Sequence, residues 1–213
     1  MKRLIVLASA SPRRRSLLKT LNVSFDVENS GVTEQTGEHH QPSDYAVEMA
    51  RQKAVAVAAR WPDAVILGAD TVVVADSEIL GKPANEKDAS RMLKLLRNRR
   101  HLVITGLALV DSRNGVTLLR NVQTGVQMAD YSDQAILDYI SGGEPLDKAG
   151  AYAIQGQGGS LVTGIDGCYT NVVGLPLCEV AEMLREVGIE IPAVPPPCTD
   201  QAGRPCPRST EEG

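Results

Sequence analysis

The apolar run AVILGADTVVVA (64–75) predicts a long β-strand in the interior, and Asp70 interrupts it. A buried carboxylate without a partner is costly, so Asp70 must be paired with a cation, bind a metal ion or be neutral. A carboxylate held by cations in a cleft is a candidate metal ligand or general base. The alternative is a core aspartate that caps a loop, or a bulge at Gly68. Because the flanking residues are so apolar, we favour the functional interpretation.

Strand and helix patterns alternate around this run, which predicts an α/β fold with a large mixed sheet. Asn114-Gly115 between two apolar runs is a strong hairpin signal. Expected strands span 4–8, 24–27, 64–75, 101–111 and 116–128. Expected helices span 11–21, 45–60, 85–96 and 132–141, and an apolar segment at 172–187 ends as an amphipathic helix.

The chain length of 213 residues suits one ordinary domain, which we assign to 1–190. The segment 191–213 is rich in proline and polar residues and has no periodicity, so we expect a disordered tail or linker.

A net charge of −4 argues against a nucleic-acid partner or an anionic membrane surface, because both favour a basic field. No apolar run approaches the roughly 20 residues of a membrane span. The apolar part of the N-terminus is shorter than that of a signal peptide, so we expect a cytoplasmic protein without a membrane partner. The four cysteines show no metal-ligand spacing.

The segment SASPRRRSLLKTL (9–21) places three arginines at the start of a helix, where the helix dipole disfavours cations. Ser11 is a suitable N-cap, and proline is tolerated at the next position. At about 100° per residue, Arg14 lies on the apolar stripe with Leu18, whereas Arg15 faces solvent. An inward arginine at a helix N-terminus requires an anion, which is either a bound phosphate or a carboxylate of the protein.

Further charged residues lie in loops or at a helix margin. Lys53 lies at the edge of its helix's apolar stripe, where a peripheral position is the simpler interpretation. Lys82 lies in the turn LGKPAN, and Glu34 in a polar loop is either a second metal ligand or merely exposed. The glycine-rich segment 141–162 contains Asp147 and Lys148 and would let a ligand approach the backbone. This combination suits metal-assisted cleavage of a phosphate ester, and no P-loop or GxGxxG motif is present.

Several segments together resemble the Maf family of nucleoside triphosphate pyrophosphatases. They are LASASPRR, RQKA, GADTVV, GKP, TGLALV, GEPLDKAGAYAIQG and NVVGLPL, in family order over about residues 4 to 187. The resemblance implies an elongated mixed sheet with flanking helices and a central cleft, related to inosine-triphosphate pyrophosphatases, and commonly a homodimer. It also implies hydrolysis of a nucleoside triphosphate to the monophosphate and pyrophosphate with Mg²⁺ or Mn²⁺.

The resemblance also assigns roles to individual residues. Asp70 would accept a proton from the attacking water, and Glu34 and Asp70 would lie near the metal ion. The implied phosphate-binding residues are Ser9, Arg14, Lys53 and Lys82.

Arg13, Thr71 and Gln155 match the family branch that favours dTTP and UTP. The Gln155 amide can pair with both a donor and an acceptor on a uracil or thymine edge. Many members of that branch have glutamate at the position of Gly81, whereas the branch that acts on 7-methyl-GTP has glycine there, as this chain does. The match at Arg13, Thr71 and Gln155 makes dTTP and UTP the expected substrates, with modified pyrimidine triphosphates as further candidates. The alternatives are a 7-methyl-GTP pyrophosphatase and a nucleotide-binding regulator of cell division.

Overall fold

A computed structural model describes residues 3–33 and 41–191, so Glu34 and the proline-rich tail lie outside the described residues. Its strands form one seven-stranded mixed sheet in the order β2-β1-β3-β5-β6-β7, with β4 paired to β3. The strands are β1 (Ile5–Leu7), β2 (Phe25–Val27), β3 (Val65–Ala75), β4 (Glu78–Leu80), β5 (Arg100–Asp111), β6 (Val116–Met128) and β7 (Val162–Asp166). The first three strands in this order run parallel, and the other pairs are antiparallel.

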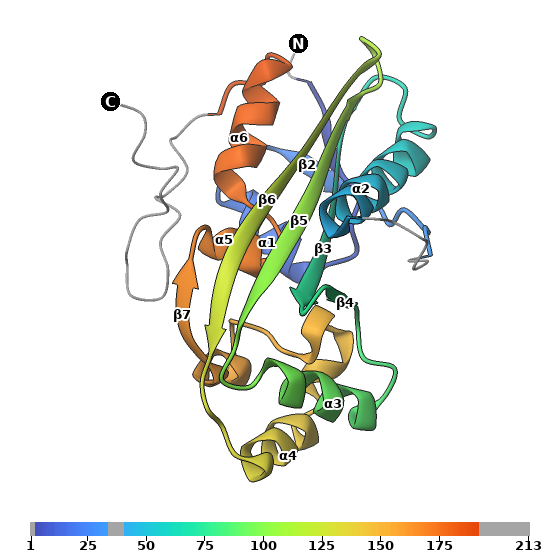
Figure 1. Ribbon diagram of the computed structural model, residues 1–213. Coiled ribbons are helices and arrows are strands. Elements are labelled where there is room, and N and C mark those ends of the chain that lie inside the picture. Colours follow the sequence, from blue (N-terminus) through green and yellow to red (C-terminus); the bar gives the residue numbers. More distant parts are fainter. Residues whose placement is uncertain (1–2, 34–40, 192–213) are drawn as a thin grey trace, which may run out of the picture.

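Helices cover both faces of the sheet (Figure 1). The helices are α1 (Pro12–Lys19), α2 (Pro42–Ala58), α3 (Glu86–Leu96), α4 (Asp133–Ser141), α5 (Tyr169–Val173) and α6 (Leu177–Glu186). Figure 1 shows α2 on one side of β3 and β5, and α1, α5 and α6 on the other, while α3 and α4 lie together at one end. The predicted α/β class with a mixed sheet and flanking helices is confirmed. None of the described helices has the length and apolar character needed to cross a bilayer.

The predicted hairpin is present, because β5 and β6 pair antiparallel from Asp111↔Val116 onward. Gly115 in the connecting turn has a φ of +68°, which glycine adopts without strain. Two short strands, β4 and β7, were not predicted. The apolar segment expected at 172–187 ends in the amphipathic helix α6, as predicted. Its first residues belong to a separate short helix, α5, which Gly174 ends with a φ of +115°.

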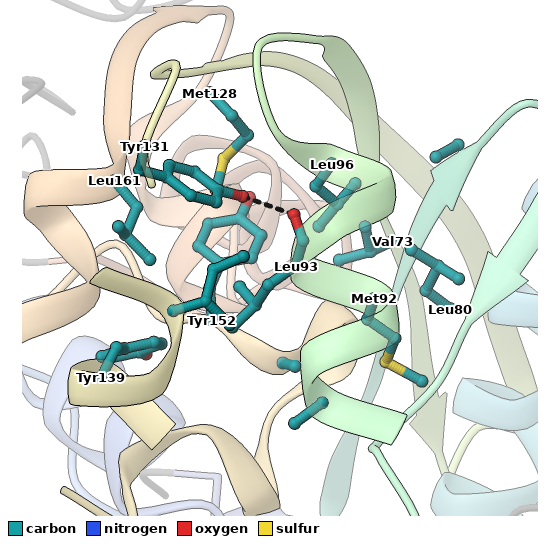
Figure 2. Packing of buried hydrophobic residues seen from close by; sticks show 14 of the residues in the cluster. Val73, Leu80, Met92, Leu93, Leu96, Met128, Tyr131, Tyr139, Tyr152 and Leu161 are labelled. Atoms are coloured by element: carbon teal, nitrogen blue, oxygen red, sulfur yellow. Dashed lines mark hydrogen bonds between the residues drawn. The ribbon is translucent and has the colours of Figure 1, made fainter. Parts of the chain in front are cut away.

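The core at the α3–α4 end of the sheet contains three buried tyrosines (Figure 2). The Tyr131 hydroxyl donates a hydrogen bond to the Leu93 carbonyl at 2.7 Å. The Tyr152 hydroxyl lies 2.7 Å from Nε2 of His101, which is itself buried on β5. These bonds satisfy polar groups that would otherwise be costly to bury and fix the loop that carries Tyr152 against the sheet.

The buried His101 makes the stability of the fold sensitive to acid. Burial lowers the pKa of His101 to about 4. Between pH 6.5 and 4 the unfolded chain therefore binds more protons than the folded chain, and the free energy of unfolding falls as the pH falls. The loss attributable to His101 is about 3 kcal/mol, from the size of the pKa shift.

His101→Gln removes this titration while keeping a group that can bond the Tyr152 hydroxyl. Urea unfolding from pH 7 to pH 4 should show a shallower loss of stability in His101→Gln than in the wild type. An equal dependence of the free energy of unfolding on pH in the two proteins would show that His101 does not cause the acid sensitivity.

Candidate active site

A cavity of about 460 Å³ opens between the β1–α1 loop, the middle of β3 and the loop that follows α4. This volume is typical of a site for a small ligand. The structure brings together every described residue that the sequence suggested for the site. The cavity is lined by Ser9, Arg13, Arg14, Lys53, Asp70, Thr71, Lys82 and Gln155.

A buried ion pair lies at the centre of the cavity wall. Lys53 Nζ is 2.5 Å from Asp70 Oδ1, and the side chains are only 9% and 6% exposed. Lys53 is thus not a peripheral lysine. The ammonium offsets the charge of a carboxylate that would otherwise be expensive to bury, and both groups border the cavity where a ligand can meet them.

Helix α2 delivers Lys53 to Asp70 because the helix lies unusually close to the sheet. A side chain at Gly68 on β3 would overlap the backbone of α2 at Ala50, and one at Gly106 on β5 would overlap it at Ala46. Asp70 and Gly106 are register partners on adjacent strands. Successive strand side chains alternate between faces, so Asp70 points to the α2 side with Gly68.

Arg14 lies on the other face of β3 and is held by three oxygen acceptors. Its Nε donates to the Gly174 carbonyl at 2.8 Å, its Nη2 to Thr71 Oγ1 at 3.0 Å and its Nη1 to Ser9 Oγ at 3.4 Å. The Ser11 side chain accepts from the Arg14 amide and caps α1 as predicted. The inward orientation of Arg14 and the exposure of Arg15 are confirmed. The guanidinium is thereby fixed at the cavity wall, in a geometry suited to a bound anion.

Arg13 and the glycine-rich segment face each other across the mouth of the cavity. Arg13 Nη1 lies 3.8 Å from Asp147 Oδ2, and Lys148 Nζ lies 2.5 Å from Asp147 Oδ1. Partial burial raises the pKa of the Asp147 carboxyl, but the hydrogen bond from Lys148 and the charges of Lys148 and Arg13 outweigh it and hold that pKa below its usual range. Asp147 is therefore an anion that a negatively charged ligand would compete with for Arg13.

Lys82 and Gln155 border the cavity from two loops and are both exposed. Gly81 also lines the cavity, and a Cβ at this position would meet nothing within 4 Å. The structure therefore has room for a Cβ at the position where many members of the dTTP/UTP branch have glutamate. Glu34 lies outside the described residues.

Two features of the site were not identified from the sequence. One is the pairing of Asp147 with Arg13, because these residues lie far apart in the chain. The other is the hydroxyl of Thr105. Thr105 is fully buried behind Thr71, with the two hydroxyl oxygens 2.9 Å apart. The signal for Thr105 was its place as a polar residue at the start of the apolar segment TGLALV.

Known structures and proteins resemble the chain to different degrees. The solved Ham1 protein of Staphylococcus aureus is 16% identical, with a TM-score of 0.43 over 60% of this chain and 73% of that chain. A HAM1 protein from Coxiella burnetii is also 16% identical, with a TM-score of 0.42 over 61% of this chain and 74% of that chain. Likenesses this distant do not bear on the chemistry of the site.

Sequence relatives are much closer. The dTTP/UTP pyrophosphatase of Geobacter metallireducens is 51% identical over 184 residues, which is 86% of this chain and 96% of that protein. The protein of the same name from Dictyoglomus thermophilum is 47% identical over 192 residues, which is 90% of this chain and all of that protein. The family described as Maf-like protein matches residues 4–187. The chain therefore belongs to the Maf family.

Proposed function

We propose that the protein hydrolyses dTTP and UTP to the nucleoside monophosphate and pyrophosphate. The observation that carries this proposal is the buried Asp70–Lys53 pair, which faces a cavity lined by further cationic side chains. A carboxylate among cations is the arrangement needed to activate water beside a polyphosphate. The names of relatives at 47–51% identity support the same substrates.

In the proposed reaction Asp70 accepts one proton from a water molecule, and the resulting hydroxide attacks the α-phosphorus. The bond from the α-phosphorus to the bridging oxygen breaks, and its electron pair leaves on that oxygen with pyrophosphate. Lys53 holds the Asp70 carboxylate in place and adds positive charge beside the reacting phosphates. Fixed cations stabilise the charge that develops on the leaving group.

The remaining lining residues divide between the phosphates and the base. We assign Ser9, Arg14 and Lys82 to the triphosphate, because a guanidinium and an ammonium suit phosphate oxygens. We assign Arg13, Thr71 and Gln155 to the choice of base. The Gln155 amide can donate to a carbonyl oxygen on the edge of uracil or thymine.

We also propose a divalent cation, Mg²⁺ or Mn²⁺, held by Asp70 together with Glu34. The described residues contain no group of three or more acidic, histidine or cysteine side chains that could hold a metal ion. Mg²⁺ is commonly held by one or two carboxylates plus substrate phosphates, so Asp70 on the cavity wall fits this mode. When bound, the cation would neutralise phosphate charge.

A cytoplasmic location and a homodimer complete the proposal. The resemblance to the Maf family suggests the homodimer, and light scattering on purified protein would measure the oligomeric state directly.

The substrate assignment predicts a specific pattern of pyrophosphate release. With Mg²⁺ or Mn²⁺, purified protein should release pyrophosphate from UTP and dTTP with a kcat/KM at least tenfold above that for ATP, GTP and 7-methyl-GTP. A chelator should abolish release, and added metal should restore it. No release from any pyrimidine triphosphate would contradict the proposed function, and a preference for 7-methyl-GTP would support the alternative enzyme.

A further inference from the structure

The hydroxyl of Thr71 at the cavity wall and that of Thr105 behind it form a line of hydrogen bonds that ends at the backbone carbonyl of Asn171. Thr71 on β3 and Thr105 on β5 are register partners, and their hydroxyl oxygens lie 2.9 Å apart. We propose that Thr105 is a positioning residue that makes the Thr71 hydroxyl a hydrogen-bond acceptor toward the bound base. This inference rests on the proposed function, because it concerns how the same cavity distinguishes one base from another.

The direction of the hydrogen bonds follows from the partners at the two ends of the line. Thr105 Oγ1 lies 3.3 Å from the Asn171 carbonyl, which can only accept, so Thr105 donates its single proton there. Thr105 must then accept the proton of Thr71. At its other side, Thr71 Oγ1 accepts from Arg14 Nη2 at 3.0 Å, and a guanidinium has no acceptor. The Thr71 hydroxyl therefore has no proton left to donate into the cavity.

Asn171 gives the line a fixed end. Its side chain is fully buried, and its Nδ2 donates to the Val103 carbonyl at 3.1 Å and to Thr124 Oγ1 at 2.9 Å. These bonds tie α5 to β5 and β6, so the backbone carbonyl of Asn171 cannot easily move away from Thr105. Hydrogen bonds among buried groups on three elements favour one arrangement of these groups, although the side-chain oxygen of Asn171 has no hydrogen-bond partner among the described residues.

An acceptor at Thr71 has a consequence for the choice of base. A hydroxyl oxygen has two acceptor sites, and one of them receives Arg14. The other is available to an N–H of the ligand at the half-buried cavity wall. Uracil and thymine carry an N–H at N3, whereas cytosine has a lone pair there. Thr71 held as an acceptor thus favours UTP over CTP.

Thr105→Val tests this arrangement with little change in shape. Valine keeps the branched side chain, and the Asn171 carbonyl retains its hydrogen bond from the Gly174 amide at 2.9 Å. The proton of Thr71 loses its acceptor and can turn toward the cavity, where it would meet the N3 lone pair of cytosine. The oxygen of Thr71 can still accept from Arg14, so the binding of phosphate groups should not change.

The experiment measures kcat/KM for UTP and CTP in the wild type, Thr105→Val and Thr105→Ser, with the Ki of CTP against UTP where turnover of CTP is too slow. Inorganic tripolyphosphate serves as a probe of phosphate binding alone. The UTP-to-CTP ratio should fall at least tenfold in Thr105→Val and stay within threefold of the wild type in Thr105→Ser. The Ki of tripolyphosphate should stay within twofold in all three.

Other outcomes overturn the inference. An unchanged UTP-to-CTP ratio in Thr105→Val would show that Thr105 does not set the Thr71 hydroxyl. Equal losses for both nucleotides and for tripolyphosphate would show a general structural defect instead. If Thr105→Val does not fold, Thr105→Ala removes the same hydroxyl and should lower the same ratio. A wild type that cleaves no pyrimidine triphosphate would refute the proposed function itself, which is a separate result.

Discussion

Asp70→Asn should lower kcat for UTP by at least about a thousandfold, because the amide cannot accept the proton of the attacking water. Asparagine has nearly the shape of aspartate, so the cavity should keep its form. Binding of UTP, measured by calorimetry, should change far less than turnover. A variant that retains more than a tenth of the wild-type kcat would show that another group is the general base.

The same substitution should also lower the stability of the fold, and the two effects can be separated. Asp70→Asn leaves the buried Lys53 ammonium without the carboxylate 2.5 Å away, which typically costs about 3 kcal/mol. Combining Asp70→Asn with Lys53→Met removes both charges and should recover most of the free energy of unfolding. Turnover should remain lost in the double variant, which would exclude instability as the cause of inactivity.

Asp111→Asn is a matched control for the loss of a buried, paired carboxylate. Asp111 is the last residue of β5, five positions after Gly106, the register partner of Asp70. It is 1% exposed and forms an ion pair with Arg3. Its replacement should lower the free energy of unfolding while kcat stays within twofold of the wild type. A loss of turnover comparable to that of Asp70→Asn would mean that the assay reports stability and not chemistry.

The sequence predicted those parts of the site that follow from local patterns. Asp70 was identified because one charged residue in an apolar strand needs a partner, and the structure supplies Lys53. Arg14 was placed inward from its helical angle relative to Leu18, and its contacts with Gly174 and Thr71 agree. In both cases the physical signal lies within a few residues of the position it concerns.

Other parts depend on contacts between distant segments, which no local pattern encodes. Whether Lys53 is peripheral or buried depends on how closely α2 approaches β3 and β5, and that distance is set by Gly68 and Gly106. The Arg13–Asp147 pair depends on where the glycine-rich loop crosses the cavity. The short strand β7 contains a glycine and has no buried residue, so its sequence lacks the alternation that identifies a strand.

Gly106→Ala should be among the most damaging single substitutions in the sheet. The added methyl group would overlap the backbone of α2 at Ala46 and Val47, and backbone cannot move aside as a flexible side chain can. Forcing the helix away from the sheet should cost about 3 kcal/mol, at the upper end for overpacking. For a domain of this size the midpoint of thermal unfolding should fall by roughly 6–12 °C. Gly164→Ala on β7 is the matched control, because its Cβ would meet only Gln127 at 3.7 Å.

The displacement of α2 in Gly106→Ala should also lower catalytic activity, because α2 is the helix that carries Lys53. Gly106 is the register partner of Asp70, so a methyl group there acts beside the Asp70–Lys53 contact. At a temperature where Gly106→Ala is still folded, its kcat should fall clearly, whereas Gly164→Ala should keep wild-type turnover. A Gly106→Ala variant with lower stability but full kcat would show that the site tolerates a shift of α2. A Gly106→Ala variant with wild-type stability would show that the close approach of α2 to the sheet does not require glycine at this position.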